Sequence, residues 1–464
     1  LFAAALIFVT GLPVAYYAAR YNIDLDLITR GAGFGYYGSV LTAIIFASFT
    51  FIFFALEGSI MAQGLWVGLG VPLWAGYLAS TLIVLPLVVY GMKALSKLQL
   101  WTTPFWLILM AAPVIYLVSS QPAILGDWMA YQGTEGYGGV SIAAVMLGAG
   151  VCLALMGQIG EQIDYLRFMP AKTRENRGRW WAAVLAAGPG WVILGAAKQM
   201  IGALLAFYLV SKVADSAATE PARQFVSIFS EMLPLWAALT LSVILVVISQ
   251  IKINVTNAYS GSLAWTNAFT RITRHYPGRI VFVVVNLAIA LALMEGNMFA
   301  VLGNILGFYS NCAIAWVVVV ATDIVINKYL LGLSPKEPEF RRGMLYAVNP
   351  VGTIAFVASA GLAIAAYFGL LGAFLSSYSP LVAVIVGVVL PPVLAALTGG
   401  RYYLARDDDG IDSPRFTADG TPSADIHTCQ SCHADFERPD VLYSAYQGGV
   451  VCSLCRATEP LNAG

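Results

Sequence analysis

Long apolar stretches separated by short polar connections fill the chain from residue 1 to about residue 400. A helix that crosses a hydrocarbon core about 30 Å thick needs roughly 20 such residues, and a helix satisfies its own backbone groups in lipid. The pattern therefore predicts an all-α polytopic membrane domain over residues 1–400. Its eleven predicted spans lie at about 1–19, 38–65, 72–92, 100–120, 139–163, 180–210, 234–264, 280–296, 298–327, 350–373 and 379–399.

The composition supports a lipid environment. Hydrophobic residues make up 59% of the chain and charged residues 11%, and the mean hydropathy is +0.77. Soluble domains have about 25% charged residues, so a soluble globular fold is excluded. The formal net charge is zero, which gives no sign of a nucleic-acid partner. The expected partners are membrane lipid and a small-molecule solute.

Lysine and arginine are distributed unequally between alternate loops. The basic set comprises Arg20, Arg30, Lys93, Lys97, Arg167, Lys172, Arg174, Arg177, Arg179, Arg271, Arg274, Arg279, Lys328, Lys336, Arg341, Arg342, Arg401 and Arg406. The alternate set holds Lys212 and Arg223. The positive-inside rule predicts a multi-pass protein of the inner (plasma) membrane with a cytoplasmic C-terminus. Because Leu1 then lies outside and within an apolar run, we expect at least one preceding helix to be missing from the chain.

Four ionisable side chains fall well inside predicted spans: Glu57, Glu161, Lys198 and Lys252. Charged groups at membrane depth are costly and usually face a bundle interior or a water-filled path. Lys198 is predicted either to reach the interface or to pair with a carboxylate. Asp164, near the end of a span, is interpreted as reaching the interface.

The segment "ISQIKINVTNAYSGS" carries a broad polar stripe. Helical spacing places Gln250, Asn254 and Asn257 in one row. A second row beside it holds Ser249, Lys252, Thr256 and Ser260. Such a stripe in the middle of a membrane lines a solute path or a binding site. The alternative is that it joins helices, since Ser, Asn and Gln often form hydrogen bonds between membrane helices.

Two spans contain residues that favour a break in the helix. The first, "VMLGAGVCLALMGQIGEQIDYLRF", contains Gly148, Gly150, Gly157 and Gly160, and the second contains "AAGPGW". Discontinuous helices in secondary transporters expose backbone groups that bind substrates, and proline kinks a helix. The alternative for any single glycine is close packing against a neighbouring helix.

The order of several motifs resembles the nucleobase–cation symporter family, which includes cytosine permeases and the bacterial hydantoin transporter. The motifs are "PVAYYAARYNIDLDLITRGAGFGYYGS", "FFALEGSIMAQGL", "GEQIDYLRFMP", "NVTNAYSGSLAWTNAFTRITRHYPGRI" and "VATDIVINKYLL". The resemblance implies a transporter fold of twelve helices, the first ten forming two inverted five-helix repeats. The spans of this chain would be helices two to twelve. The family's unwound first helix, which supplies substrate and cation contacts, would then be absent.

The resemblance also implies positions for a solute site. Phe49 takes the place of the aromatic residue that stacks on the substrate in the family. Phe53 takes the place of a neighbouring residue that makes a polar contact with the substrate. Asn257 takes the place of the asparagine that recognises the substrate. The residues of the family's sixth helix that contact the substrate fall between Gly148 and Gln158. With the polar groups of the spans, the candidate substrate-binding residues are Phe49, Phe53, Glu57, Gln158, Glu161, Asn254 and Asn257.

The chain departs from the family at the cation position. Counted back from Asn257, the family's two sodium-ligating hydroxyl groups fall on Ile251 and Lys252. An isoleucine side chain cannot ligate sodium, whereas an ammonium group can occupy the cation position itself. We therefore interpret Lys252, with Ser249 beside it, as the ion-coupling candidate, either as a tethered substitute for the ion or as a proton carrier. Phe53 in place of a polar contact argues against a nucleobase as the substrate.

The composition changes after residue 400. Residues 401–427 are acidic and contain Pro, Ser and Gly, which predicts a flexible linker. Residues 428–464 form a cysteine-rich tail with two C-x2-C pairs nineteen residues apart: Cys429, Cys432, Cys452 and Cys455. Four thiolates at this spacing are typical of tetrahedral Zn²⁺. Iron in a rubredoxin-like site and a redox dithiol pair are the alternatives.

These features favour a secondary active transporter that moves a small polar, nucleobase- or hydantoin-like solute by alternating access. The alternative is a transporter-like solute sensor that signals through its cytoplasmic tail to a kinase-type partner. An enzyme is not expected, because the sequence has no G-x-S-x-G or H-E-x-x-H motif and no histidine in a predicted span.

Overall fold

The computed structural model describes residues 1–133, 141–210, 212, 218–297, 302–406 and 425–460. The helices before residue 400 are α1 (Phe2–Tyr21), α2 (Leu25–Thr29), η1 (Arg30–Phe34), α3 (Gly35–Leu69), α4 (Leu73–Val89), α5 (Met92–Ser120), α6 (Ile124–Ala130), α7 (Ile142–Leu153), η2 (Ala154–Gly157), α8 (Gln158–Leu166), α9 (Arg177–Ala187), α10 (Trp191–Val210), α12 (Pro221–Met232), α13 (Leu235–Thr273), α14 (Arg279–Glu295), α15 (Leu302–Thr322), η4 (Asp323–Leu330), η5 (Arg342–Met344), α16 (Pro350–Tyr367), α17 (Ala373–Ser377) and α18 (Ser379–Leu397). The tail contains β1 (Ile426–Thr428), β2 (Asp435–Glu437), η6 (Arg438–Asp440), β3 (Val441–Ser444), β4 (Gly449–Cys452) and α19 (Ser453–Arg456).

The predicted all-helical, multi-span fold is confirmed. Within the described residues, nine helical segments are long and apolar enough to cross a membrane. The predicted spans 72–92 and 280–296 correspond to α4 and α14, which have 17 residues each. Residues 139–140 and 298–301 of two predicted spans, 407–424 of the predicted linker and 461–464 of the predicted tail lie outside the described residues.

Both predicted helix breaks are present. A 3₁₀ segment, η2, separates α7 from α8, and α9 ends at Ala187 before α10 begins at Trp191. A third break, the π-helical segment η1, precedes α3. Here Gly35 has a φ of 78°, and an added Cβ atom would lie 2.8 Å from the backbone nitrogen of Asn349. Glycine therefore allows the α15–α16 connection to approach this break closely.

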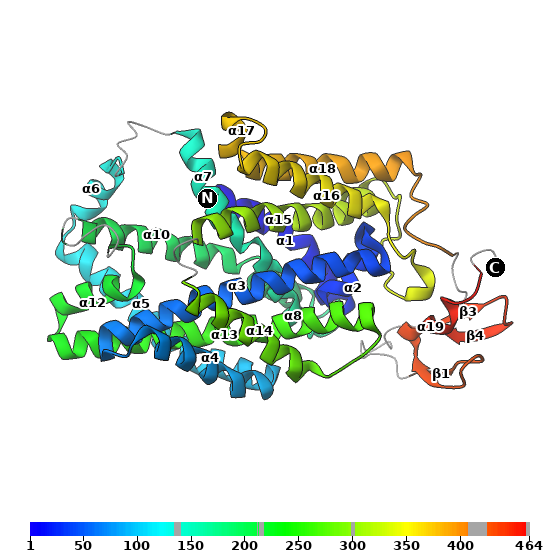
Figure 1. Cartoon of the computed structure of the whole chain (residues 1–464), viewed down its shortest axis with the longest axis horizontal. Helices are drawn as coiled ribbons and strands as arrows, with labels where there is room; N and C mark the ends of the chain where they lie inside the picture. The colour runs from blue at the N-terminus through cyan, green and yellow to red at the C-terminus, as the bar shows by residue number, and fades with distance from the viewer. Residues whose placement is uncertain (134–140, 211, 213–217, 298–301, 407–424, 461–464) are drawn as a thin grey trace.

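Helices α3 and α13 form the centre of the bundle and pack along each other (Figure 1). On one side α4 and α14 cover this pair through an apolar cluster that includes Phe54 and Leu287. On the other side α1, α8 and α15 cover α3 through a larger cluster that includes Phe49 and Trp316. A third cluster joins α5, α10 and α12 to the first half of α13. The long central helices thus place their polar side chains between apolar layers.

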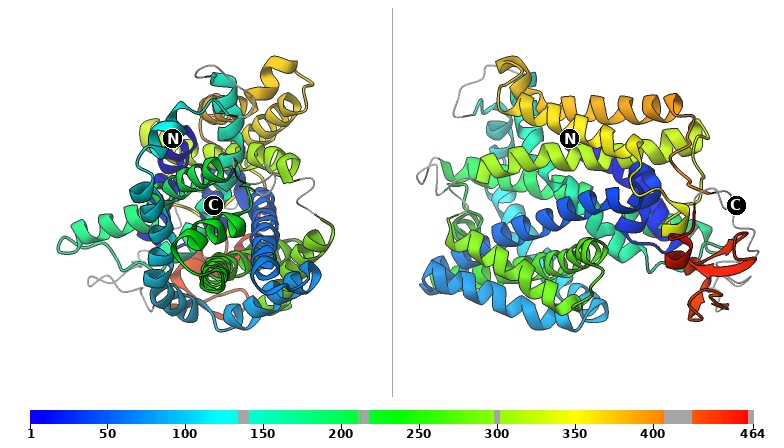
Figure 2. Two further views of the ribbon diagram at one scale, coloured as in Figure 1. Left: turned by 90° about the vertical axis from the view of Figure 1, so that its left-hand side faces the viewer. Right: turned by 45° about the vertical axis from the view of Figure 1, so that its right-hand side comes forward.

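The tail lies at one end of the bundle. The connections from α1 to α2, from α13 to α14 and from α15 to α16 lie at the same end, and α6, α12 and α17 lie at the opposite end (Figures 1 and 2). The loops of the basic set therefore gather at the end that carries the tail.

Candidate functional site

The predicted aromatic residues lie where α3 passes the break between α7 and α8. The ring centroids of Phe49 and Phe53 are 4.4 Å apart, and Phe49 also stacks on Phe46 at 6.3 Å. Gly157 faces the Phe49 ring so closely that a Cβ atom there would lie 2.5 Å from the ring atom Cδ2. We call Phe49 and Phe53 the aromatic wall. The structure brings this wall and the predicted helix break together.

The first polar row of α13 faces α3 in the bundle interior. Asn257 has 0% exposure, and its Nδ2 donates a hydrogen bond to Asn254 Oδ1 at 3.2 Å. Asn254 Nδ2 in turn donates to the carbonyl oxygen of Phe54 on α3 at 3.4 Å. One turn away, Gln250 lies against Glu57, also on α3. The structure therefore assembles three predicted site residues, Glu57, Asn254 and Asn257, at one helix interface.

Glu161 of α8 extends this row. It is 2% exposed and lies within electrostatic range of Glu57. We call Glu57, Glu161, Gln250, Asn254 and Asn257 the polar seam. Three of its buried oxygen atoms have no hydrogen-bond partner among the described residues: Glu161 Oε1, Gln250 Oε1 and Asn257 Oδ1. Since an unmet buried acceptor costs about 1–3 kcal/mol, the seam retains a strong capacity to accept hydrogen bonds.

Two other predicted residues lie beside the seam. Gln158 begins α8 and is half-buried. Lys198 on α10 is exposed and lies within electrostatic range of Glu57. In the described part of the chain, no hydrogen bond or ring contact joins Phe49 to Asn257.

Lys252 points away from the seam. Its Nζ donates to Thr103 Oγ1 at 2.7 Å, and to Thr102 Oγ1 and the Gln99 carbonyl oxygen at 3.2 Å each, all on α5. Ser249 lies on the same side of α13 and accepts a hydrogen bond at 2.7 Å from an α5 tryptophan. The two ion-coupling candidates thus share the interface between α13 and α5. The rest of the second row meets α8 instead: Tyr165 Oη donates to Thr256 Oγ1 at 2.8 Å, and Ser260 lies beside Asp164.

The four tail cysteines converge on one point. Their Sγ atoms all lie within 4.8 Å of one another, and those of Cys432 and Cys452 are 3.9 Å apart. Thiolates bound at about 2.3 Å to tetrahedral zinc lie about 3.8 Å from each other, so the arrangement fits a metal ion. The first pair lies on the turn between β1 and β2, and the second spans the end of β4 and α19.

Backbone amides support one of these thiolates. The N–H groups of Cys432 and Cys452 point at Cys429 Sγ, at N···S distances of 3.5 and 3.1 Å. Burial alone raises the pKa of the Cys429 thiol, but these amides outweigh burial and lower its pKa to about 6. A thiol with such a pKa is largely ionised at neutral pH, as metal ligation requires.

The tail is fixed to the connection between α15 and α16, residues 331–349. Arg341 Nη1 donates to the Val441 carbonyl oxygen at 3.0 Å, and the Gly343 amide donates to Ser453 Oγ at 2.9 Å. Gly343 is tightly enclosed, because an added Cβ atom would lie 2.8 Å from Leu442 Cδ1. The tail therefore packs on this connection through backbone and side-chain contacts.

The same connection is bonded to the helix break at η1. The Tyr37 amide donates to the Ala347 carbonyl oxygen at 2.7 Å, and the Asn349 amide donates to the Phe34 carbonyl oxygen at 2.9 Å. Residues 331–349 thus form a bridge, which we call the tail bridge, between the cysteine cluster and the start of α3.

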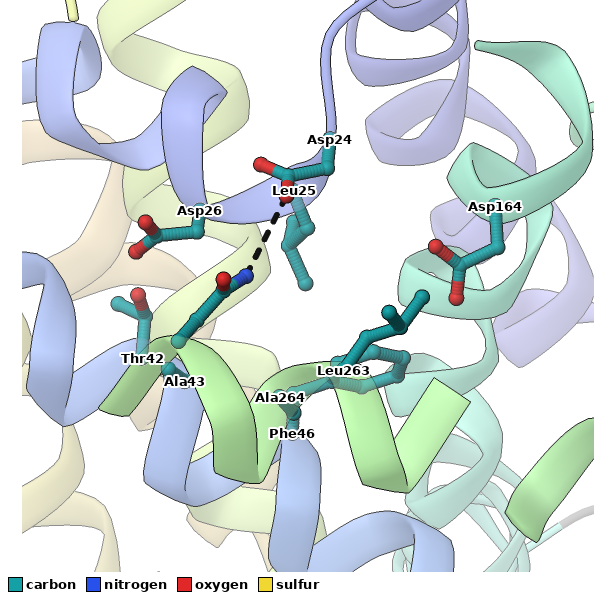
Figure 3. Close-up of a pocket in the computed structure, with 10 residues that line it drawn as sticks. Asp24, Leu25, Asp26, Thr42, Ala43, Phe46, Asp164, Leu263 and Ala264 are labelled. Carbon is teal, nitrogen blue, oxygen red and sulfur yellow. Dashed lines mark hydrogen bonds between the residues drawn. The ribbon is translucent and has the colours of Figure 1, made fainter. Parts of the chain in front are cut away.

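A cavity that the sequence did not predict lies between α2, α3, α8 and α13 (Figure 3). Its water-accessible volume of about 20 Å³ has room for one water molecule or one small ion. It is lined by Asp24, Leu25, Asp26, Thr42, Ala43, Phe46, Asp164, Leu263, Ala264 and Asn267. The prediction that Asp164 reaches the interface is wrong, because it is 5% exposed and lines this cavity. Only the tertiary contact of α2 with α8 reveals the group.

Solved structures share this fold. An inward-facing conformation of Mhp1 matches with a TM-score of 0.62 and 16% identity, over 86% of this chain and 82% of that chain. Mhp1 in a closed conformation with bromovinylhydantoin bound is described as a nucleobase-cation-symport-1 family transporter. It matches with a TM-score of 0.59 and 16% identity, over 87% of this chain and 86% of that chain. The chain has the fold of a secondary transporter. A Na⁺-coupled sialic acid symporter also matches, at 0.52 and 12% identity, over 85% of this chain and 89% of that chain.

A scan with protein-family models finds no match, and a search of curated proteins also finds none. At 12–16% identity, the likeness to the solved structures concerns the fold alone. A transporter fold is consistent with a protein that is not an enzyme. Fold alone does not identify a solute, because one fold carries many functions.

Proposed function

We propose that the chain is a secondary active transporter of the nucleobase–cation symporter type that carries a small heterocyclic solute rich in N–H donors. The observation that carries this proposal is the set of unpartnered buried oxygens in the polar seam, within the described part of a Mhp1-like fold. All three atoms are hydrogen-bond acceptors, so they complement a solute that donates. A site built to accept such bonds rejects analogues that lack the donors, because its acceptors would then stay unpaired.

The aromatic wall supplies the second element of recognition. Phe49 and Phe53 are buried and pack on each other at the level of the break between α7 and α8, so we propose that solute binding separates them and exposes a ring face. Aromatic faces stack on flat rings, and a broken helix offers backbone groups to a ligand. A ring that carries amide or ureide N–H groups, as a hydantoin does, combines a flat face with donors. A nucleobase has the same features, but it is a less favoured substrate because Phe53 offers it no polar contact.

Ser249 and Lys252 are our proposed ion-coupling residues. The Lys252 ammonium is a fixed positive charge between α13 and α5, held by three acceptors on α5. A charge fixed in this position can replace a mobile cation that would otherwise join two helices. We therefore expect solute binding that does not require sodium at this position.

The test is uptake of radiolabelled hydantoins, nucleobases and amino acids into proteoliposomes that contain the full-length protein, with and without sodium or proton gradients. The expected result is gradient-driven accumulation of an N–H-rich ring that is lost in Asn257→Ala. The matched control is Gln121→Ala, which removes an exposed amide outside the site. Folded protein that accumulates no panel member under either gradient would overturn the proposal.

We further propose that the cysteine cluster binds Zn²⁺ and that it faces the cytoplasm together with the basic loops. Four thiolates and no oxygen ligand favour zinc or iron over harder ions. Elemental analysis of protein purified without added metal distinguishes the two, with one zinc per chain as the expected result. Iron with a visible charge-transfer absorption would contradict zinc.

The tail bridge favours a second candidate function, a solute sensor. The bridge joins the cysteine cluster to the backbone at η1, at the start of the helix that carries the aromatic wall. A solute that moves α3 would therefore also move the tail. A kinase-type partner bound to the tail would respond to that movement. Solute-dependent thiol labelling of the exposed Cys432, without accumulation in proteoliposomes, would favour the sensor. Accumulation without any change in labelling would favour the transporter.

A further inference from the structure

We propose that Glu161 of α8 carries the proton whose gradient drives transport. Its side chain is 2% exposed, and its Oε1 has no hydrogen-bond partner among the described residues. Burial of an ionised carboxylate without a paired charge or a hydrogen bond is so costly that the group takes up a proton instead. Glu161 is therefore a group whose charge can change during a transport cycle. The inference rests on the proposed function and names its coupling ion.

Glu161 has no counter-charge. Within the described part of the chain, no lysine or arginine forms an ion pair with it. Its charged neighbours are two other carboxylates, Glu57 of α3 and Asp164 of α8. Two basic groups face those neighbours instead: Lys198 of α10 faces Glu57, and Arg167 faces Asp164. Because like charges repel strongly where water is excluded, a proton on Glu161 relieves the repulsion.

Polar side chains close to Glu161 on the same helix have other partners. The Tyr165 hydroxyl donates to Thr256 Oγ1 of α13 at 2.8 Å. Gln162 Nε2 donates to the Gly11 carbonyl oxygen of α1 at 3.0 Å. Among the residues that the structure describes, the helices around α8 therefore give Glu161 neither a charged nor a neutral partner, and a proton is the ligand that remains.

Lys252 is the other candidate for a proton carrier, and its contacts fit a fixed charge. An ammonium group has three N–H donors. Lys252 directs them at the hydroxyl groups of Thr103 and Thr102 and at the Gln99 carbonyl oxygen, all on α5. Loss of a proton would leave one of these three bonds unmade, whereas Glu161 has no such bond to lose. Lys252 therefore keeps its charge, and Glu161 is the group that exchanges a proton.

Carboxylates lie on both sides of Glu161, as in the acidic chains that relay protons through membrane transporters. On one side is the half-buried Glu57, in the half of α3 that points away from the tail (Figure 1). On the other side, Asp164 and Asp24 line the cavity that has room for one water molecule. In each step one O–H bond breaks as another forms. A proton thus enters Glu161 from one side and leaves it to the other, and no other bond changes.

Protonation of Glu161 acts on the contact between α8 and α3. Gly160 lies so close to the Phe46 ring that a side chain there would overlap it, and Phe46 stacks on Phe49 of the aromatic wall. Glu161 follows directly and interacts with Glu57 across the same interface. When both carboxylates are ionised, they push α8 away from α3. A proton removes this repulsion, so it stabilises the packing that forms the solute site.

Sodium-free proteoliposomes that contain the full-length protein test the inference. The probe is the radiolabelled hydantoin, nucleobase or amino acid that the wild type exchanges fastest. With one pH unit across the membrane, alkaline inside, one proton per solute sets a limit of about tenfold accumulation, because equal concentration ratios carry equal free energy. We expect the wild type to approach this limit. Addition of solute should also carry protons into the vesicles, which a pH-sensitive dye records.

Glu161→Gln keeps an acceptor oxygen but cannot take up a proton. It should exchange solute across the membrane as the wild type does and accumulate none under the pH gradient. A structural role would instead lower exchange and accumulation together. The matched control is Glu175→Gln, which changes an exposed carboxylate between α8 and α9 and should behave like the wild type.

Glu161→Gln that accumulates solute as the wild type does would overturn the inference, and so would loss of exchange in a variant that thermal unfolding shows to be folded. If the variant does not fold, the dye measurement on the wild type decides, because absence of proton entry also overturns the inference. Accumulation driven by a sodium gradient alone would overturn it and leave the proposed function intact. Exchange of no panel member would overturn the proposed function itself.

Discussion

Gly157→Ala should displace the Phe49 ring and weaken solute binding. The backbone at Gly157, with φ of −60° and ψ of −23°, accepts alanine without strain. The new Cβ atom, however, would lie 2.5, 2.6 and 3.0 Å from Cδ2, Cγ and Cβ of Phe49. Ordinary carbon contacts are about 3.5–4.0 Å, so the ring has to move by roughly 1 Å.

Overpacking of this kind costs about 1–3 kcal/mol. If the solute needs the ring in its original place, the same cost appears in binding, as a loss of roughly 5-fold to 150-fold in affinity. The assay is a titration of the full-length protein with the panel solute that binds most tightly, combined with the midpoint of thermal denaturation.

Gly148→Ala is the matched control. Gly148 lies in α7, and a Cβ atom there would meet nothing within 4 Å. Alanine at this position should raise helix stability by up to about 1 kcal/mol and leave binding unchanged. The reasoning is wrong if Gly157→Ala binds solute as tightly as Gly148→Ala and melts at the same temperature.

Three further changes test other parts of the structure. Asn257→Ala should lower kcat/KM for uptake of an N–H-rich solute at least about tenfold, because a buried acceptor is lost; unchanged uptake kinetics would contradict its place in the site. Cys452→Ser, or treatment with a strong chelator, should release the tail metal, and elemental analysis that finds full metal content would refute a four-cysteine site. Asp26→Asn leaves the buried Arg271 without its charged partner, so the free energy of unfolding should fall by about 3–5 kcal/mol. The matched control is Asp127→Asn, which changes an exposed carboxylate on α6, and an equal thermal midpoint for the two variants would contradict this.

The sequence predicted more of the candidate site's composition than of its arrangement. Helical spacing correctly placed Asn254 and Asn257 in one row, since side chains three or four positions apart share a helix face. It also placed Lys252 in the row beside them, yet that row meets two partners: Lys252 contacts α5, and Thr256 accepts a hydrogen bond from Tyr165 of α8. Spacing fixes the angle between side chains on one helix, but the neighbour that each side chain meets depends on how the other helices pack.

By itself, the sequence determined the helical, membrane-spanning class, the positions of two helix breaks and the pairing of four cysteines into one cluster. Each of these follows from local chemistry: hydrophobic length, glycine and proline, and short cysteine spacing. Only the tertiary structure decided that Asp24 and Asp164, 140 positions apart, line one cavity, and that the tail contacts the α15–α16 connection. Contacts between distant segments form because folding buries apolar helix faces against one another, and single-helix periodicity does not specify which faces meet.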